Sequence, residues 1–139
     1  MTLNSLRPEI RLAVEAARDK QAVDITVLRL SGSNAFAEYF LLCSGQSQPQ
    51  IRAIAEGIEE GLARRGVHLA HREGKVGAEW VLLDYGHFVV HIFSERAREY
   101  YDLERLWRAA ERLELSAAGR PPDSPSEQAR DSESGTPRI

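Results

Sequence analysis

The segment 79–93, EWVLLDYGHFVVHIF, constrains the fold of this chain more than any other. Two apolar runs flank Gly86, and glycine readily adopts the positive φ that a tight hairpin turn needs. The pattern therefore predicts a β-hairpin, in which successive side chains alternate between two faces. One face is almost wholly apolar and is predicted to face the core. It holds Val81, Leu83, Tyr85, Phe88, Val90 and Ile92.

The opposite face of this hairpin combines aromatic, aliphatic, acidic and imidazole side chains. It holds Trp80, Leu82, Asp84, Val89, His91 and Phe93. A strand face with that composition is either half covered by another element or forms a surface that binds a partner. The sequence leaves both interpretations open.

Composition limits the class of protein. The 139 residues suit one domain, and no apolar run approaches the about 18 residues that span a bilayer. The N-terminus lacks a signal-peptide core and Cys43 has no second cysteine to pair with, so we expect a cytoplasmic protein without membrane attachment. The net charge of −3 disfavours binding to phosphate backbones and suits a basic partner. We expect no direct sequence-specific binding to nucleic acid.

Apolar periodicity predicts the remaining elements. A first helix is expected over residues 8–20, and a second begins at Ser47 and ends at Gly66. A third helical segment is expected after Ser94, with a last apolar stripe over residues 103–113. Strands are expected over residues 24–30, 38–43 and 67–71. The strand 38–43 is continuously apolar and should be buried on both faces.

The order of these elements predicts an α/β fold class. We expect a single domain over residues 1–115, with a mixed β-sheet and helices packed on it. Residues 116–139 are rich in proline, serine, glycine and charged residues. They contain too little apolar surface to offset the entropy of ordering, so they are predicted to form a disordered polar tail.

A test for nucleotidyl transfer argues against catalysis. Such a domain would carry a Gly-Ser turn before a strand with two alternate carboxylates that hold two metal ions. Gly32 and Ser33 precede a strand that begins near Glu38, but the position two residues on is Phe40. One carboxylate cannot hold the metal pair. Glu38 is therefore expected to be a strand-end residue, in water or paired with a backbone donor, and no catalytic residue is predicted.

Metal and cofactor sites are not predicted either. The histidines His68, His71, His87 and His91 do not converge at zinc-ligand spacing, and one cysteine does not complete a set. Cys43 is expected to be a small buried side chain. No glycine-rich segment matches a phosphate-binding pattern. The aromatic residues Tyr100, Tyr101 and Trp107 could stack on bases, but their helical spacing with Leu103 and Leu106 favours core packing.

Three segments together resemble the ribosomal silencing factor family, RsfS, also called Iojap-like. They are 37–60 (AEYFLLCSGQSQPQIRAIAEGIEE), 77–93 (GAEWVLLDYGHFVVHIF) and 98–110 (REYYDLERLWRAA). Each alone is weak, but their joint order and spacing are specific. The chain departs from the family at Glu38, where Asp is commoner, and at His87, where an acid or similar polar residue is common.

The resemblance implies a nucleotidyltransferase-like α/β fold without that enzyme activity, and no cofactor. It further implies binding to the large ribosomal subunit through ribosomal protein number fourteen. Docking there would sterically block the small subunit from joining and so repress translation. The family's contact surface includes the Trp-x-Leu-Leu-Asp-Tyr strand, which is residues 80–85 here.

From this resemblance and the mixed hairpin face, we select six candidate binding residues. They are Glu73, Trp80, Leu82, Asp84, Tyr85 and His91. Trp80 is of the type most often found at binding hot spots, but the C-terminal helix could cover it. Asp84 could complement a basic partner together with Glu73 and Glu79, or it could merely stabilise the hairpin turn.

Two other classes of function remain open at this point. One is a nucleotidyltransferase-related enzyme with residual nucleotide chemistry. The other is a self-associating adaptor, since a sheet face of mixed polarity could pair with its own copy in a homodimer.

Overall fold

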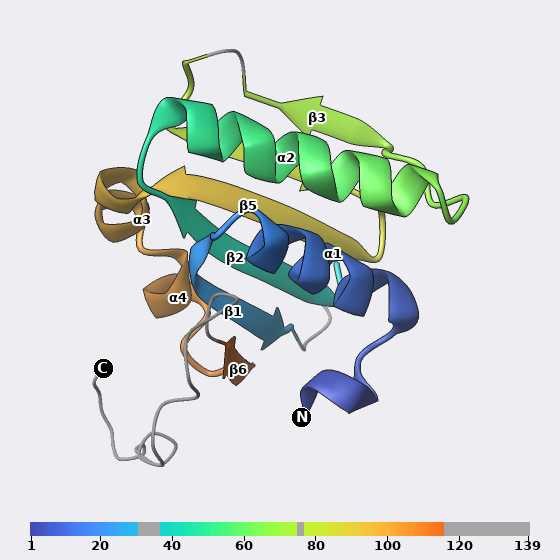
Figure 1. The fold of residues 1–139 in the computed structure, drawn as a ribbon. Coiled ribbons are helices and arrows are strands. Elements are labelled where there is room, and N and C mark those ends of the chain that lie inside the picture. Colours follow the sequence, from blue (N-terminus) through green and yellow to red (C-terminus); the bar gives the residue numbers. More distant parts are fainter. Residues whose placement is uncertain (31–36, 75–76, 116–139) are drawn as a thin grey trace.

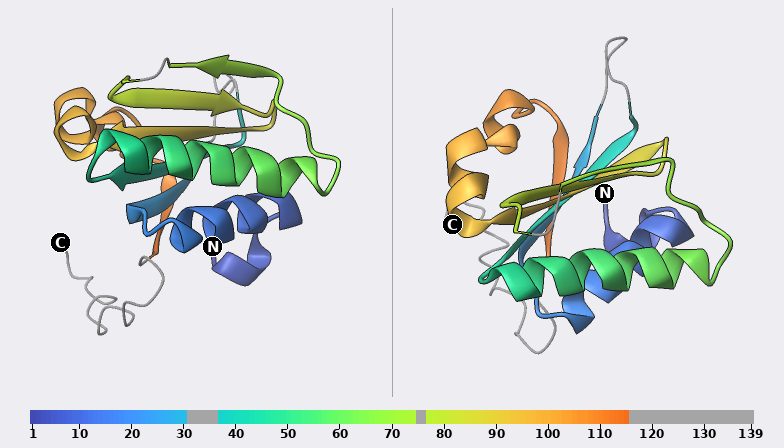
Figure 2. Two further views of the ribbon diagram at one scale, coloured as in Figure 1. Left: turned by 45° about the horizontal axis from the view of Figure 1, so that its top comes forward. Right: turned by 90° about the horizontal axis from the view of Figure 1, so that it is seen from above.

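The computed structural model describes residues 1–30, 37–74 and 77–115, which form a six-stranded mixed sheet between two layers of helices (Figures 1 and 2). The strand order is β3-β4-β5-β2-β1-β6, in which β2 and β5 are parallel and all other neighbours are antiparallel. The strands are β1 (Val23–Arg29), β2 (Tyr39–Gly45), β3 (His71–Glu73), β4 (Trp80–Asp84), β5 (Phe88–Ser94) and β6 (Glu111–Leu115).

The helices divide between the two faces of this sheet. A short 3-10 turn, η1 (Leu3–Ser5), precedes α1 (Pro8–Asp19), which packs beside α2 (Gln48–Ala63) on one face. The short helices α3 (Glu95–Tyr101) and α4 (Leu103–Leu106) lie on the other face. The predicted α/β class, with a mixed sheet and packed helices, is confirmed.

The predicted hairpin is present as β4 and β5. Trp80 pairs with Phe93, Leu82 pairs with His91, and Gly86 has a φ of +93° in the turn. A non-glycine residue at that φ would be strained. The two cross-strand pairs join residues of the predicted mixed face, so the predicted assignment of side chains to the two faces of the hairpin is correct.

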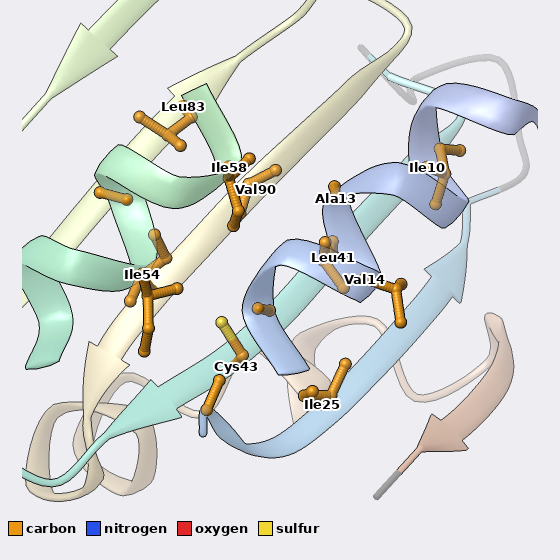
Figure 3. Packing of buried hydrophobic residues seen from close by; sticks show 14 of the residues in the cluster. Ile10, Ala13, Val14, Ile25, Leu41, Cys43, Ile54, Ile58, Leu83 and Val90 are labelled. Carbon is orange, nitrogen blue, oxygen red and sulfur yellow. The ribbon is translucent and has the colours of Figure 1, made fainter. Parts of the chain in front are cut away.

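The main core lies between the sheet and the helix pair α1 and α2 (Figure 3). Ile54 and Ile58 of α2 and Val14 of α1 belong to the same buried cluster as Leu41 and Val90 of the central strands. All residues of the predicted core face of the hairpin are buried in this cluster: Val81, Leu83, Tyr85, Phe88, Val90 and Ile92.

Strand β2 is central and buried on both faces, as its continuous hydrophobicity predicts. Leu41 and Cys43 face the main core, whereas Phe40 and Leu42 belong to a second buried cluster under α3 and α4. Burial raises the pKa of the Cys43 thiol to about 12. A thiol with that pKa stays protonated and inert, so the expectation of a small buried side chain is confirmed.

The expected helical stripe over residues 103–113 is wrong. Helix α4 ends at Leu106, and residues 111–115 form strand β6, in which Leu113 and Leu115 pair with Val27 and Ile25 of β1. The alternation in ERLEL fits a strand, and β1 offers an unpaired edge to it. The tertiary pairing therefore overrides an apolar spacing that also fits a helix.

The strand expected at residues 67–71 is displaced toward the C-terminus. Gly66, with a φ of +77°, ends the region of α2 as predicted, and the Val67 N–H still donates to Leu62 O at 2.9 Å. Pairing with β4 begins only when the Ala70 N–H donates to Asp84 O at 2.8 Å, so β3 covers His71–Glu73.

Two predictions fall outside the described residues. These are the disordered tail at residues 116–139 and the segment with Gly32 and Ser33 that precedes the strand near Glu38. Within the described part of the chain, no helix is both long and apolar enough to cross a bilayer.

We expect Leu83→Ala to destabilise the fold by about 2–5 kcal/mol, because it leaves a cavity where a fully buried side chain packed. Leu82→Ala is the matched control on the same strand, since Leu82 lies half-buried on the opposite face. Denaturant unfolding of both variants measures the difference. Equal losses from the two variants would contradict the assignment of the hairpin faces.

Candidate partner-binding surface

The sheet face that carries α3 and α4 brings most of the candidate residues together. Cross-strand pairing places Glu73 beside Leu82 and Leu82 beside His91, so these side chains form one row across β3, β4 and β5. Trp80 and Asp84 lie two residues to either side of Leu82 and share its face. The α3 residue Tyr101 contacts Trp80 from above the sheet. We call Glu73, Trp80, Leu82, Asp84 and Tyr101 the Trp80 surface.

Tyr85 is not part of the Trp80 surface. Its side chain lies in the main core on the other face, 8% exposed, and its ring stacks on Phe88 with centroids 5.0 Å apart. Burial raises the pKa of its phenol to about 12. Tyr85 therefore supports the turn of the hairpin from the core side.

Trp80 is partly exposed and held on several sides. Its ring centroid lies 5.1 Å from that of Phe93 and 4.6 Å from that of Tyr101. Its indole Nε1–H donates to Nδ1 of His91 at 3.1 Å. Trp80 was expected either to be covered by the C-terminal helix or to bind a partner. Both are compatible with the structure, because α3 covers only part of the indole.

His91 is buried, with only 4% of its surface exposed. Because Nδ1 accepts the Trp80 proton, the neutral ring carries its own proton on Nε2, which makes no hydrogen bond to the described residues. The Phe40 ring meets the imidazole edge to face, with centroids 4.5 Å apart. Burial lowers the pKa of His91 to about 4, so the ring is uncharged near neutral pH.

The carboxylates of Asp84, Glu73 and Glu79 differ in their hydrogen-bond partners. Asp84 is partly exposed, and its Oδ1 accepts the Gly86 N–H at 2.8 Å, so its role in the turn is confirmed. Glu73 is exposed on β3 and lies against Nε2 of His71. Glu79 instead accepts from Arg96 and Ser94, and the Arg96 hydrogen bond is the main cause that lowers the pKa of Glu79. Asp84 and Glu73 are thus the acids of the Trp80 surface.

Arg98 is an organising residue that the sequence analysis missed. Its side chain is 12% exposed and pairs with Glu104 at 2.6 Å. The same guanidinium donates to Ser44 Oγ of β2 at 3.2 Å and to Thr26 Oγ1 of β1 at 3.1 Å. Arg98 thereby fixes α3 and α4 to the sheet. The sequence did hold one sign of this role. Thr26 is a polar residue in a predicted strand and Ser44 directly follows another, and buried polar groups need hydrogen-bond partners.

The expected core packing of Tyr100, Tyr101 and Trp107 is only partly correct. Trp107 packs against Phe40 with ring centroids 5.9 Å apart, but Tyr100 is 80% exposed and Tyr101 is 50% exposed. Leu106 is 74% exposed. The Tyr100 ring packs edge to face on Tyr101, which in turn contacts Trp80, so Tyr100 adds exposed aromatic area beside the Trp80 surface.

The structure shows the surroundings of Glu38, the carboxylate considered for metal binding. Glu38 is exposed and its carboxylate pairs with the Arg7 guanidinium at 2.9 Å, so its partner is a side chain and not a backbone donor. Among residues 1–30, 37–74 and 77–115, no group of three or more His, Cys, Asp or Glu side chains is placed to hold a metal ion.

Comparison with known proteins identifies the family. The family described as RsfS, ribosomal silencing factor during starvation, matches residues 3–138. The chain belongs to the RsfS family. The resemblance found from its motifs is therefore confirmed.

Individual relatives agree with this RsfS assignment. The ribosomal silencing factor RsfS of Bacillus subtilis is 41% identical over 106 residues, which cover 76% of this chain and 90% of that protein. The RsfS of Halalkalibacterium halodurans is 40% identical, with 76% and 91% covered. A mouse protein named mitochondrial assembly of ribosomal large subunit protein 1 is 29% identical over 102 residues, covering 71% of this chain and 45% of its own.

A solved structure supports the fold. A crystal structure of a protein from Chromobacterium violaceum superposes with a TM-score of 0.70 and 32% sequence identity, covering 86% of this chain and 98% of that chain. The bacterial relatives from Bacillus subtilis and Halalkalibacterium halodurans both carry the name ribosomal silencing factor.

We expect Arg98→Met to destabilise the fold by about 3–5 kcal/mol, because Glu104 keeps a largely buried charge without its partner. Arg105→Met is the matched control, since Arg105 is exposed and its removal should change stability little. Denaturant unfolding measures both. Similar stabilities would show that Arg98 does not hold α3 and α4.

We also expect stability to fall as the pH falls. Burial lowers the folded-state pKa of His91 from 6.5 to about 4, so between these values only the unfolded chain binds the proton. This difference should cost about 2 kcal/mol between pH 7 and pH 5. His91→Phe should lack that contribution while carboxylate titrations continue. Parallel unfolding of both proteins at the two pH values measures it, and equal losses would contradict a buried neutral imidazole.

Proposed function

We propose that this protein binds the large ribosomal subunit through ribosomal protein number fourteen and thereby blocks association with the small subunit. Membership of the RsfS family is the observation that carries the proposal. The bound domain would occupy a contact between the subunits and so repress translation in the cytoplasm. No step of this mechanism needs a catalytic group.

The Trp80 surface is the proposed contact. It combines an aromatic anchor with flanking carboxylates, and a partly exposed tryptophan is the residue type that dominates many interfaces. Glu73 and Asp84 would complement a basic protein surface and steer its approach. Leu82 and Tyr101 would supply apolar area around the anchor.

Co-sedimentation tests the proposal directly. The purified protein is mixed with isolated large subunits, isolated small subunits and associated ribosomes, and each mixture is separated on a sucrose gradient. We expect the protein to travel with large subunits and to reduce their joining with small subunits. Sedimentation with small subunits alone, or with neither subunit, would contradict the proposal.

The rival functions give different results in parallel assays. A residual nucleotidyltransferase would bind nucleotide in the presence of Mg²⁺. A self-associating adaptor would sediment as a homodimer whose formation depends on the Trp80 surface.

Asp84 offers a sharp test of the proposed contact. Asp84→Asn keeps an oxygen that can accept the Gly86 N–H but removes the negative charge, so the turn should survive. We expect large-subunit affinity to fall about two- to tenfold, with a weaker salt dependence and a melting temperature close to that of the wild type.

The control for this charge change lies on the far side of the molecule. Glu56 is exposed on α2, on the opposite layer, so Glu56→Gln should leave affinity unchanged. Asp84→Arg should weaken binding more than Asp84→Asn, because it also introduces a like charge against a basic partner. Full affinity in Asp84→Asn would assign Asp84 to the turn alone.

A further inference from the structure

We infer that His91 is a positioning residue for Trp80. Its Nδ1 accepts the hydrogen bond of the indole N–H, so that Trp80 offers a partner only its ring. The inference rests on the proposed function, in which Trp80 is the anchor of the contact. It also names the chemistry of the partner group, which would be the side chain of a lysine or arginine lying against the indole.

The geometry of the hairpin makes this contact possible. Trp80 pairs with Phe93, and His91 is the diagonal neighbour two residues away on β5, on the same face of the sheet. The distance from Nε1 of Trp80 to Nδ1 of His91 is 3.1 Å, which is a normal hydrogen-bond length. An indole has one donor and no acceptor, so this bond uses its whole hydrogen-bonding capacity.

The surroundings of His91 indicate that its role is specific. The imidazole lies among aromatic rings, with Phe40 at 4.5 Å and Phe93 at 6.1 Å between centroids, where an apolar side chain would pack without a desolvation cost. Its Nε2 is buried and unpaired among the described residues. The indole of Trp80 is therefore the partner that accounts for a polar ring at this position.

The protonation state of His91 at neutral pH suits this hydrogen bond. Burial keeps the imidazole neutral near pH 7, so the Nδ1 lone pair is always available to the indole. With Phe93 and Tyr101 also against the indole, Trp80 is fixed before a partner arrives. A fixed anchor loses little side-chain entropy on binding.

With its N–H already donated to His91, Trp80 can offer a partner only its ring carbons and their negative π system. An acceptor on the partner would find no free donor on the indole. A cationic side chain would gain from the ring and from the nearby carboxylates of Glu73 and Asp84. The recognition chemistry of this contact is therefore cationic and apolar.

The test compares two replacements of His91 with opposite properties. His91→Phe keeps an aromatic ring but removes the acceptor, whereas His91→Asn loses the ring but places an amide oxygen near the position of Nδ1. The full-length proteins are labelled with ¹⁵N, and the two indole N–H resonances are assigned with Trp107→Phe. Large-subunit affinity and melting temperature are measured for the same samples.

We expect binding and stability to rank the variants in opposite orders. His91→Phe should shift the Trp80 indole resonance and weaken large-subunit binding about fivefold, yet melt at or above the wild-type temperature. His91→Asn should keep the resonance nearer its wild-type position and retain more affinity, yet melt lower because its shorter polar side chain leaves a gap. A purely structural role would make affinity follow the melting temperature.

Each contrary result has one meaning. An unshifted indole resonance in His91→Phe would overturn the hydrogen bond, and a shifted resonance with full affinity would overturn the positioning role. If Trp80→Phe is added, the effect of His91→Phe on binding should disappear, because it acts only through the indole N–H. If the wild type does not bind large subunits, the proposed function fails, while the resonance still reports on the Trp80 contact.

Discussion

The structure depends on the burial of β2 from both sides. Its parallel pairing with β5 joins two antiparallel halves, β3-β4 to one side and β1-β6 to the other, into one sheet. Alternate β2 side chains then fill two separate clusters, one under α1 and α2 and one under α3 and α4. The second cluster supports the Trp80 surface, so the site depends on the same strand as the core.

Elements with one dominant period were predictable from the sequence. The hairpin was, because its alternation and Gly86 both indicate the same turn, and the parity of its strands follows directly. The C-terminal segment was not, because the apolar residues of 103–113 fit a helix while ERLEL also fits a strand. Only the free edge of β1 decides between them, and that edge exists only in the folded protein.

The candidate surface was predictable in composition but not in detail. The mixed face of the hairpin indicated Trp80, Leu82 and Asp84, and the structure places them together. Sequence spacing could not show that His91 on the same face would be buried among Phe40, Trp80 and Phe93, or that Tyr101 would come to lie on Trp80. The contact of Tyr101 follows from how α3 folds back over the sheet, which Arg98 secures through contacts distant in sequence.

The attachment of α3 and α4 gives the Trp80 surface two halves of unequal rigidity. The hairpin half belongs to a continuous hydrogen-bonded sheet, whereas the half from α3 rests on a seven-residue helix followed by Asp102 at a φ of +49°. Short helices held by a few side-chain contacts open locally at lower free energy than central strands. A partner would thus contact a rigid hairpin, β4 and β5, beside the less stable helix α3. The position of α3 could adjust to the shape of the partner, while the hairpin would keep the orientation of the contact fixed.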